Sequence, residues 1–349
     1  MITERGKRQL SNGLRAFQAS VLVEGDVTRE DLQRHFQENP TDAVFISECS
    51  SSPVSSWGGK YTRFNFSYIH REYTYNDVYK ATNIAAFNAA MTQIVGGYRE
   101  AGIICVPSNI PVETLFDKFY QRYGIFYPNY VSASMGSWQL GLCNYVFCLV
   151  KIQYRIDTAT LREMEAQTSA EVKRLAQMLF LPHMPDVAKV YLAHNYLALT
   201  VKYFLNMDAA ALEKSYQQSA YGALIRKKCV CQGYAEAFKR LMDAGGVPCQ
   251  VVLGQIQGAT YYHAWNIVRL NGGMDGYHVD VTWDISDKRP KYEYFGKSDA
   301  FFKGNRSWDE TCYSLCYKTE NIKMQAQNYV RAHRAELRAN GVPLAVLDV

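Results

Sequence analysis

Three residues between positions 228 and 284 have the side chains that nucleophilic catalysis requires: Cys231, His263 and Asp280. A cysteine attacks a carbonyl as its thiolate, and a neighbouring base, cation or helix dipole is needed to favour that thiolate. An imidazole can act as this base, and a carboxylate can hold the imidazole in one tautomer and stabilise its cation. The residue types therefore predict a nucleophile, a base and an orienting group for acyl transfer.

A helix is predicted directly after Cys231. Residues 234–244 are rich in helix formers, Gly245 and Gly246 supply a left-handed stop, and Pro248 follows just beyond. The apolar residues of this segment recur on one face: Ala237, Phe238, Leu241 and Met242. Cys231 is therefore expected at or just before the first turn, where unpaired amides and the helix dipole favour a negative sulfur by roughly 0.3–1 kcal/mol.

Two predicted strands, 260–270 and 276–283, flank the dipeptide Asn-Gly at 271–272, which strongly favours a hairpin turn. A two-residue loop would place His263 directly opposite Asp280, with Cβ atoms about 4.5–5.5 Å apart. A four-residue loop would place the two residues diagonally on the same face of the sheet. A slip by one residue would send them to opposite faces.

The segments CVCQGYAEAF, HAWNIV and YHVDVTWD, which contain these residues, resemble the core of the transglutaminase-like superfamily of cysteine enzymes. The resemblance implies that Cys231 is the nucleophile, His263 the base and Asp280 the third member of the triad. It extends over about 185–318 and includes AYGAL at 220–224, HNYLALTVKYF at 194–204, the Tyr-Phe and Ser-Asp pairs of 294–299, and Trp308. The family contains peptidases, amide-cleaving enzymes and cross-linking acyl transferases, so it leaves the substrate open.

Other residues are expected near the reacting carbonyl. The backbone amide of Cys231 is a candidate oxyanion donor, and Tyr221 is a candidate for the second donor because it lies in the matched AYGAL segment. Trp265 and Trp283 are expected either to line the cleft or to lie in the core as strand aromatics. His194 is expected to be a packed core histidine.

Zinc is a competing use of the cysteines. Cys229 and Cys231 with His263, or Cys312 with Cys316, lack the paired spacing that structural zinc sites have. We therefore expect no metal and no cofactor, and expect Cys229 to pack behind the start of the helix.

The composition is that of a globular protein. Of 349 residues, 48% are hydrophobic and 20% are charged, and the net charge of +5 comes mainly from basic residues near the two ends. Solvated helix faces explain this distribution better than a nucleic-acid footprint. The odd count of nine cysteines indicates reduced thiols. With no apolar signal or membrane span recognised, we expect a cytoplasmic protein that contacts neither nucleic acid nor membrane.

The predicted fold class is α+β: a transglutaminase-like core with Cys231 at a helix N-terminus packed on an antiparallel sheet, preceded by an α+β N-terminal region. The expected domains are an N-terminal region at 1–180, a catalytic domain at 185–318, and a basic helix and tail at 319–349. A helix–strand–strand–helix order in 27–105 recurs in 111–180, which indicates duplicated units or the chance similarity of two α+β units.

The predicted activity is hydrolysis of an amide bond in a protein or peptide substrate through an acyl-thioester. Cross-linking needs an amine to outcompete water, and the acidic residues Asp275, Asp280, Asp284 and Asp287 lack the spacing of a calcium loop that could gate such a site. Two alternatives stay open: a protein-glutamine acyl transferase, and a binding or scaffold protein that retains an idle triad.

Overall fold

The computed structural model describes residues 2–56, 59–123, 129–274, 276–286 and 289–348. The chain divides into two compact units, Met1–Tyr154 and Arg155–Val349. Helix α5 (Thr158–Leu179), which we expected in the N-terminal region, lies in the second unit because its buried residues Leu175 and Leu179 join the core of that unit. No helix of the described residues is long and apolar enough to cross a lipid bilayer.

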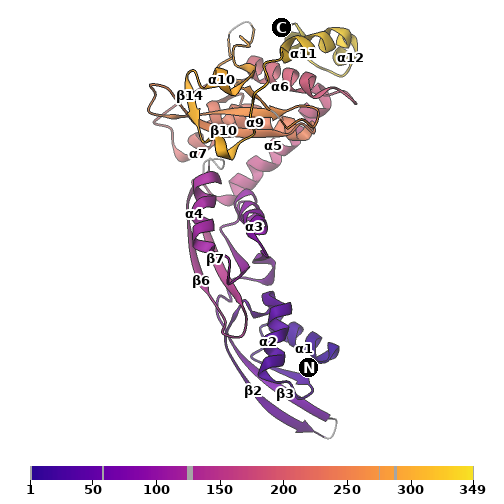
Figure 1. Ribbon diagram of the computed structural model, residues 1–349, viewed down its shortest axis with the longest axis vertical. Helices are drawn as coiled ribbons and strands as arrows, with labels where there is room; N and C mark the ends of the chain where they lie inside the picture. Colours follow the sequence, from indigo (N-terminus) through magenta and orange to yellow (C-terminus); the bar gives the residue numbers. More distant parts are fainter. Residues whose placement is uncertain (1, 57–58, 124–128, 275, 287–288, 349) are drawn as a thin grey trace. The chain divides into compact units, whose positions relative to one another are not determined.

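The first unit contains two sheets with the strand orders β1-β3-β2 and β4-β5-β7-β6 (Figure 1). Its elements are α1 (Glu4–Arg15), β1 (Ser20–Glu24), α2 (Arg29–Glu38), η1 (Pro40–Ala43), β2 (Ile46–Ser56), β3 (Gly59–Tyr68), η2 (Tyr75–Asp77), β4 (Val78–Lys80), α3 (Ile84–Gly96), β5 (Ala101–Pro107), α4 (Val112–Tyr123), β6 (Tyr130–Trp138) and β7 (Tyr145–Tyr154). The order helix, strand, helix, strand, strand occurs from α1 to β3 and again from α3 to β7, with β4 added beside β5. In both groups of elements the last strand pairs antiparallel with two other strands, β3 with β1 and β2 and β7 with β5 and β6, and common origin of the two groups stays a prediction.

The second unit is built around a five-stranded antiparallel sheet, β13-β12-β11-β10-β14. Besides α5, its elements are α6 (Asp186–Thr200), β8 (Lys202–Tyr203), α7 (Ala211–Gln217), α8 (Ala220–Leu224), β9 (Lys228–Cys229), α9 (Cys231–Ala244), β10 (Cys249–Ile256), β11 (Tyr262–Arg269), β12 (Gly276–Val279), β13 (Phe295–Lys297), α10 (Asp299–Phe302), β14 (Arg306–Trp308), η4 (Glu310–Cys312), α11 (Ile322–Ala332), α12 (Arg334–Ala339) and α13 (Leu344–Leu347). Helix α9 packs on β10 and β11, and α6 contacts α9 (Figure 1). This is the predicted α+β core, with a cysteine-bearing helix on an antiparallel sheet.

The two faces of the sheet have separate apolar cores. The predicted stripe of α9, with Phe238, Leu241 and Met242, is buried in the large core that also holds Val268 and Val279. The side chain of Asn266 faces α9, because its Nδ2 donates to the carbonyl oxygen of Ala235 at 3.0 Å. Strand alternation places His263, Trp265 and Ile267 on the opposite face, together with Asp280.

The hairpin joining β11 to β12 confirms the predicted turn but not the shorter loop. Asn271 and Gly272 both have positive φ, and the amide of Gly273 donates to the carbonyl oxygen of Leu270 at 3.0 Å. Arg269 pairs with Gly276, which is the register of the four-residue loop. The two-residue shift keeps His263 and Asp280 on one face in diagonal positions, because side chains alternate with a period of two. Asp275 and Asp287 lie outside the described residues.

Candidate active site

Cys231 is the first residue of α9, as predicted. The N-cap residue, Val230, makes no side-chain hydrogen bond to the first turn, so the positive end of the helix dipole is available to an anionic sulfur. Gly233 permits the close packing here, because a Cβ on it would lie 2.6 Å from the Cβ of Cys229 and 2.8 Å from the carbonyl oxygen of Ser219. Cys229 is fully buried behind the helix start. The half-buried Cys231 is thereby fixed at the helix end.

His263 and Asp280 form a buried hydrogen-bonded pair. Nε2 of His263 lies 2.8 Å from Oδ2 of Asp280, and the backbone amide of Trp283 donates to Oδ1 of Asp280 at 3.2 Å. Cys231 is close enough to His263 to act on its ring, and its contribution adds to that of Asp280 in raising the pKa of the imidazole. With Nε2 directed at the carboxylate, the remaining ring nitrogen, Nδ1, is the atom suited to exchange a proton with the thiol. The structure thus pairs His263 with Asp280, and the assignment of Cys231 as the nucleophile beside them stays a prediction.

The electrostatics of the pair favour a protonated imidazole. Burial lowers the pKa of His263, but the charge and hydrogen bond of Asp280, with a smaller contribution from Cys231, outweigh burial and raise the pKa to about 9. Burial likewise raises the pKa of Asp280, and the charge and hydrogen bond of His263 together with the charge of Arg306 more than reverse this effect. The pKa of His263 thus favours a positively charged imidazole at neutral pH.

Arg306 on β14 is a member of this site that the sequence analysis missed. Its Nη2 lies 2.8 Å from Oδ2 of Asp280, the same oxygen that meets His263, and both charged side chains of this ion pair are fully buried. No local motif marks Arg306, because β14 reaches the site by pairing with β10 at the far edge of the sheet. The strand is only the tripeptide Arg-Ser-Trp within a polar stretch of sequence, so no sequence signal singles out Arg306.

The other predicted site residues occupy different surroundings. Trp265 is buried in the core and donates from Nε1 to Nδ1 of His278 at 2.8 Å, so it is a core residue rather than an exposed wall. Trp283 is half-buried, with its ring centroid 5.7 Å from that of His263. Tyr221 lies on α8 with its ring 5.3 Å from that of Tyr216, and its role as an oxyanion donor stays a prediction.

Two exposed tyrosines form a group in which Tyr203 is within electrostatic reach of Cys231 and of Tyr261. Tyr203 and Tyr261 are 50% and 65% exposed, and the charge of Cys231 acts on the Tyr203 phenol. Burial of part of its ring is the main influence that raises the pKa of Tyr203 to about 12, and the charges of Cys231 and Tyr261 add to it. The sequence analysis did not assign these tyrosines to the site.

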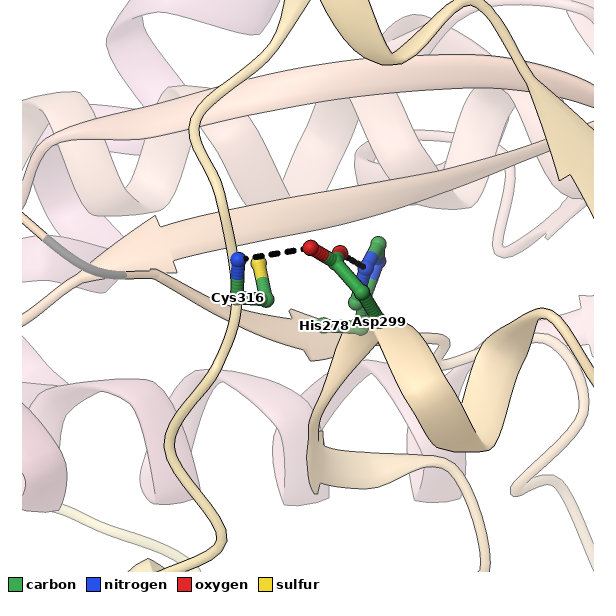
Figure 2. Close-up of side chains that lie close together, drawn as sticks. All are labelled: His278, Asp299 and Cys316. Carbon is green, nitrogen blue, oxygen red and sulfur yellow. Dashed lines mark hydrogen bonds and ion pairs between the residues drawn. The ribbon is translucent and has the colours of Figure 1, made fainter.

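A second buried cluster, His278, Asp299 and Cys316, has the residue types of a metal site, with donor atoms within 4.8 Å of one another (Figure 2). The donors are already engaged. Nε2 of His278 lies 2.8 Å from Oδ1 of Asp299, and Oδ2 of Asp299 accepts from the amide of Cys316 at 2.9 Å. Nδ1 of His278 accepts from Trp265. The hydrogen bonds explain the cluster as a link between β12, α10 and the segment containing Cys316, so it does not fit a metal.

Two further histidines form buried pairs with aspartates. His194 on α6 is fully buried, with Nε2 3.0 Å from Oδ2 of Asp284, so it is a core histidine as predicted. In the first unit, His35 and Ser11 both bind Oδ2 of Asp42, at 3.0 and 2.5 Å. Because serine and histidine share one carboxylate oxygen, this group links α1, α2 and η1 rather than placing a base beside a nucleophile.

An α+β domain with a cysteine at a helix start and a histidine–aspartate pair on the adjoining antiparallel sheet has the arrangement that the sequence motifs predicted. Residues 173–281 match the model of the transglutaminase-like superfamily, and this part of the chain is a transglutaminase-like domain.

Among curated proteins, the human kyphoscoliosis peptidase is 37% identical over 86 residues, which make up 22% of this chain and 13% of that protein. The chain therefore spans a small part of that relative. A crystal structure of a candidate cysteine protease from Cytophaga hutchinsonii is 14% identical, with a TM-score of 0.28, covering 44% of this chain and 65% of the other. A transglutaminase crystal structure is 12% identical, with a TM-score of 0.28, covering 78% of this chain and 77% of the other.

Proposed function

We propose that the second unit is a cysteine hydrolase that cleaves amide bonds in a peptide or protein. The observation that carries the proposal is the buried His263–Asp280 pair, in which Nε2 of His263 lies 2.8 Å from Oδ2 of Asp280. The thiol at the start of α9 also acts on the imidazole of this pair. A thiolate beside an imidazolium has both the nucleophile and the acid that amide cleavage requires.

The reaction has two balanced halves. The Cys231 sulfur attacks the carbonyl carbon, His263 gives its proton to the leaving amine, and an acyl-thioester and a free amine result. Water then attacks the thioester while His263 takes its proton, and the carboxylic acid and the Cys231–His263 pair are released. Asp280 keeps the imidazole oriented in both halves. The amide of Cys231 at the helix start is the proposed donor to the oxyanion.

Water is the proposed acceptor, in preference to a lysine amine. Transfer requires an amine bound at high effective concentration in a site that excludes water, whereas hydrolysis requires only access of water to the thioester. Cys231 is itself only partly buried, which supports access of water to the thiol. The human relative is a peptidase by name, which supports the same choice.

Iodoacetamide should label Cys231 before the other eight cysteines near pH 6–7, because it lies beside an imidazolium at a helix start. Burial raises the pKa of the thiols of Cys49, Cys105, Cys148 and Cys249, so these should label slowly. Peptide mapping by mass spectrometry after brief labelling gives the rate at each site. Equal rates at Cys231 and at the half-exposed Cys312 would favour the binding-protein alternative.

Turnover should release new peptide ends or ammonia, without stable amine incorporation. The test offers a glutamine-containing protein with a labelled primary amine, and separately a peptide library, to the full chain. Cleaved peptides detected by mass spectrometry support hydrolysis. Stable incorporation of the amine with neither cleavage nor ammonia release would establish the transferase alternative instead. Cys231→Ala is the blank for both assays.

A further inference from the structure

The guanidinium of Arg306 is enclosed by aromatic rings beside the candidate triad. Its Cζ atom lies 4.3 Å from the ring centroids of both Trp283 and Phe302, 4.5 Å from that of Tyr294 and 5.3 Å from that of Trp265. The ring faces carry partial negative charge and attract a cation, and the attraction is strongest where water is excluded. Arg306 is 4% exposed, so its charge is held almost entirely by these rings and by Asp280.

The hydrogen bonding of this cation is incomplete. Among the described residues, Nε and Nη1 of Arg306 have no acceptor, and Nη2 meets Oδ2 of Asp280 as a close ion pair at 2.8 Å without the geometry of a linear hydrogen bond. A buried arginine that served packing alone is expected to satisfy its N–H groups, because each unsatisfied group is unfavourable. The partners of the Arg306 charge are therefore the Asp280 carboxylate and the surrounding ring faces.

We propose that Arg306 is a positioning residue of the site: its caged guanidinium holds the Asp280 carboxylate against His263 and offsets part of the negative charge that the Cys231–His263 pair experiences. This inference rests on the proposed function, since it concerns how the same triad is tuned. A carboxylate shared by two cations, His263 and Arg306, is fixed in orientation and exerts a smaller field on each than it would on one alone.

The titratable groups around this centre come from every adjoining segment. They are Asp280 and Asp284 after β12, Tyr294 before β13, His278 on β12, Asp299 on α10, His263 on β11 and Cys231 on α9. Asp284 and Tyr294 act with Asp280 on Arg306, while His278 is paired with Asp299. Removing the positive charge of Arg306 should raise the pKa of each remaining titratable group.

The experiment measures the rate of Cys231 alkylation by iodoacetamide between about pH 4 and pH 10. It compares the unaltered full chain with Arg306→Met, which removes the charge at similar length, and with Arg306→Lys, which retains the charge. The control is Arg240→Met on α9, whose guanidinium pairs with Glu165 and Glu236 away from the triad. Circular dichroism and thermal unfolding establish whether each variant is folded.

In Arg306→Met the pH midpoint of labelling should move upward by about one unit or more, because the negative charge of Asp280 is then no longer offset by Arg306 and acts more strongly on the His263 and Cys231 pair. Arg306→Lys and Arg240→Met should keep the midpoint of the unaltered chain. If the pH profile of Arg306→Met has the same midpoint as that of the unaltered chain, the proposal is wrong. Loss of packing alone would lower the labelled fraction without moving the midpoint.

The lysine variant decides the question if Arg306→Met does not fold. A midpoint displaced by a full unit in Arg306→Lys, which retains the positive charge, also overturns the proposal. Failure of the proposed function has a different signature: Cys231 of the unaltered chain would then label like an ordinary thiol. If Cys231 of the unaltered chain labels at acidic pH and Arg306→Met has the same midpoint, only the assignment of Arg306 is wrong.

Discussion

Replacing Cys231 by alanine should abolish amide cleavage while leaving the fold intact. The loss of the nucleophile is expected to reduce turnover by about 10⁶-fold, to the background rate. Cys231 is half-buried at the first residue of α9, so exchanging its thiol for a methyl group should change the free energy of unfolding by about 1 kcal/mol or less. Steady-state kinetics on a cleaved peptide and urea unfolding followed by circular dichroism measure the two quantities.

Cys229→Ala is the matched control, because Cys229 lies two residues earlier and is fully buried. It should reduce stability, since it leaves a small cavity behind the helix start, and should retain cleavage in the folded fraction. The opposite pattern, with activity surviving in Cys231→Ala and lost in Cys229→Ala, would show that the nucleophile has been assigned to the wrong cysteine.

Replacing Asp280 by asparagine should impair both catalysis and stability. Turnover is expected to fall about 10⁴-fold, because the neutral amide can favour the wrong imidazole tautomer and does not stabilise the cation. Stability should fall by about 3–5 kcal/mol, because the buried guanidinium of Arg306 loses its carboxylate. Asp243→Asn on the exposed side of α9, where Asp243 pairs with Lys239, is a control that should change neither quantity appreciably.

The same variant should change the titration of His263, followed by NMR of its ring protons. In the unaltered protein the pKa of His263 is about 9, above the ordinary value of about 6.5 in an unfolded chain. The stabilising contribution of the protonated ring is therefore complete below about pH 6.5 and is lost as the pH rises through about 9. Without the Asp280 charge, burial remains and lowers the pKa, so the midpoint should fall below about 6.5. A midpoint that stays near 9 would contradict the assigned role of Asp280.

Local sequence chemistry was sufficient to predict where the three candidate residues lie on their elements. Helix formers ended by Gly245 and Gly246 require a helix that begins near Cys231, and the structure starts α9 at that residue. The Asn-Gly turn at 271–272 requires a hairpin, because both positions adopt positive φ. Strand alternation then keeps His263 and Asp280 on one face in either loop register. These features depend on interactions between neighbours in the chain, which a single sequence displays.

The register itself was decided by the folded sheet. A two-residue and a four-residue loop both place Asn271 and Gly272 in the turn and keep the same side chains on each face of the sheet. The structure has the longer loop. Trp265 was likewise compatible with a cleft wall or with the core. Its burial follows from packing against Phe302 and from the hydrogen bond to His278, neither of which a strand pattern specifies.

The amino-acid sequence was enough to predict a cysteine at the start of a helix, and a histidine and an aspartate on one face of a hairpin. Its motifs also predicted the transglutaminase-like class of the domain. The tertiary structure alone decided the register, the buried His278–Asp299–Cys316 cluster and the position of Arg306. Arg306 lies on β14, which adds to the sheet beside β10, and its guanidinium reaches Asp280 over the ring of Trp265 on β11. Contacts of this kind depend on the order of strands in space, whereas turn and helix signals depend on adjacent residues.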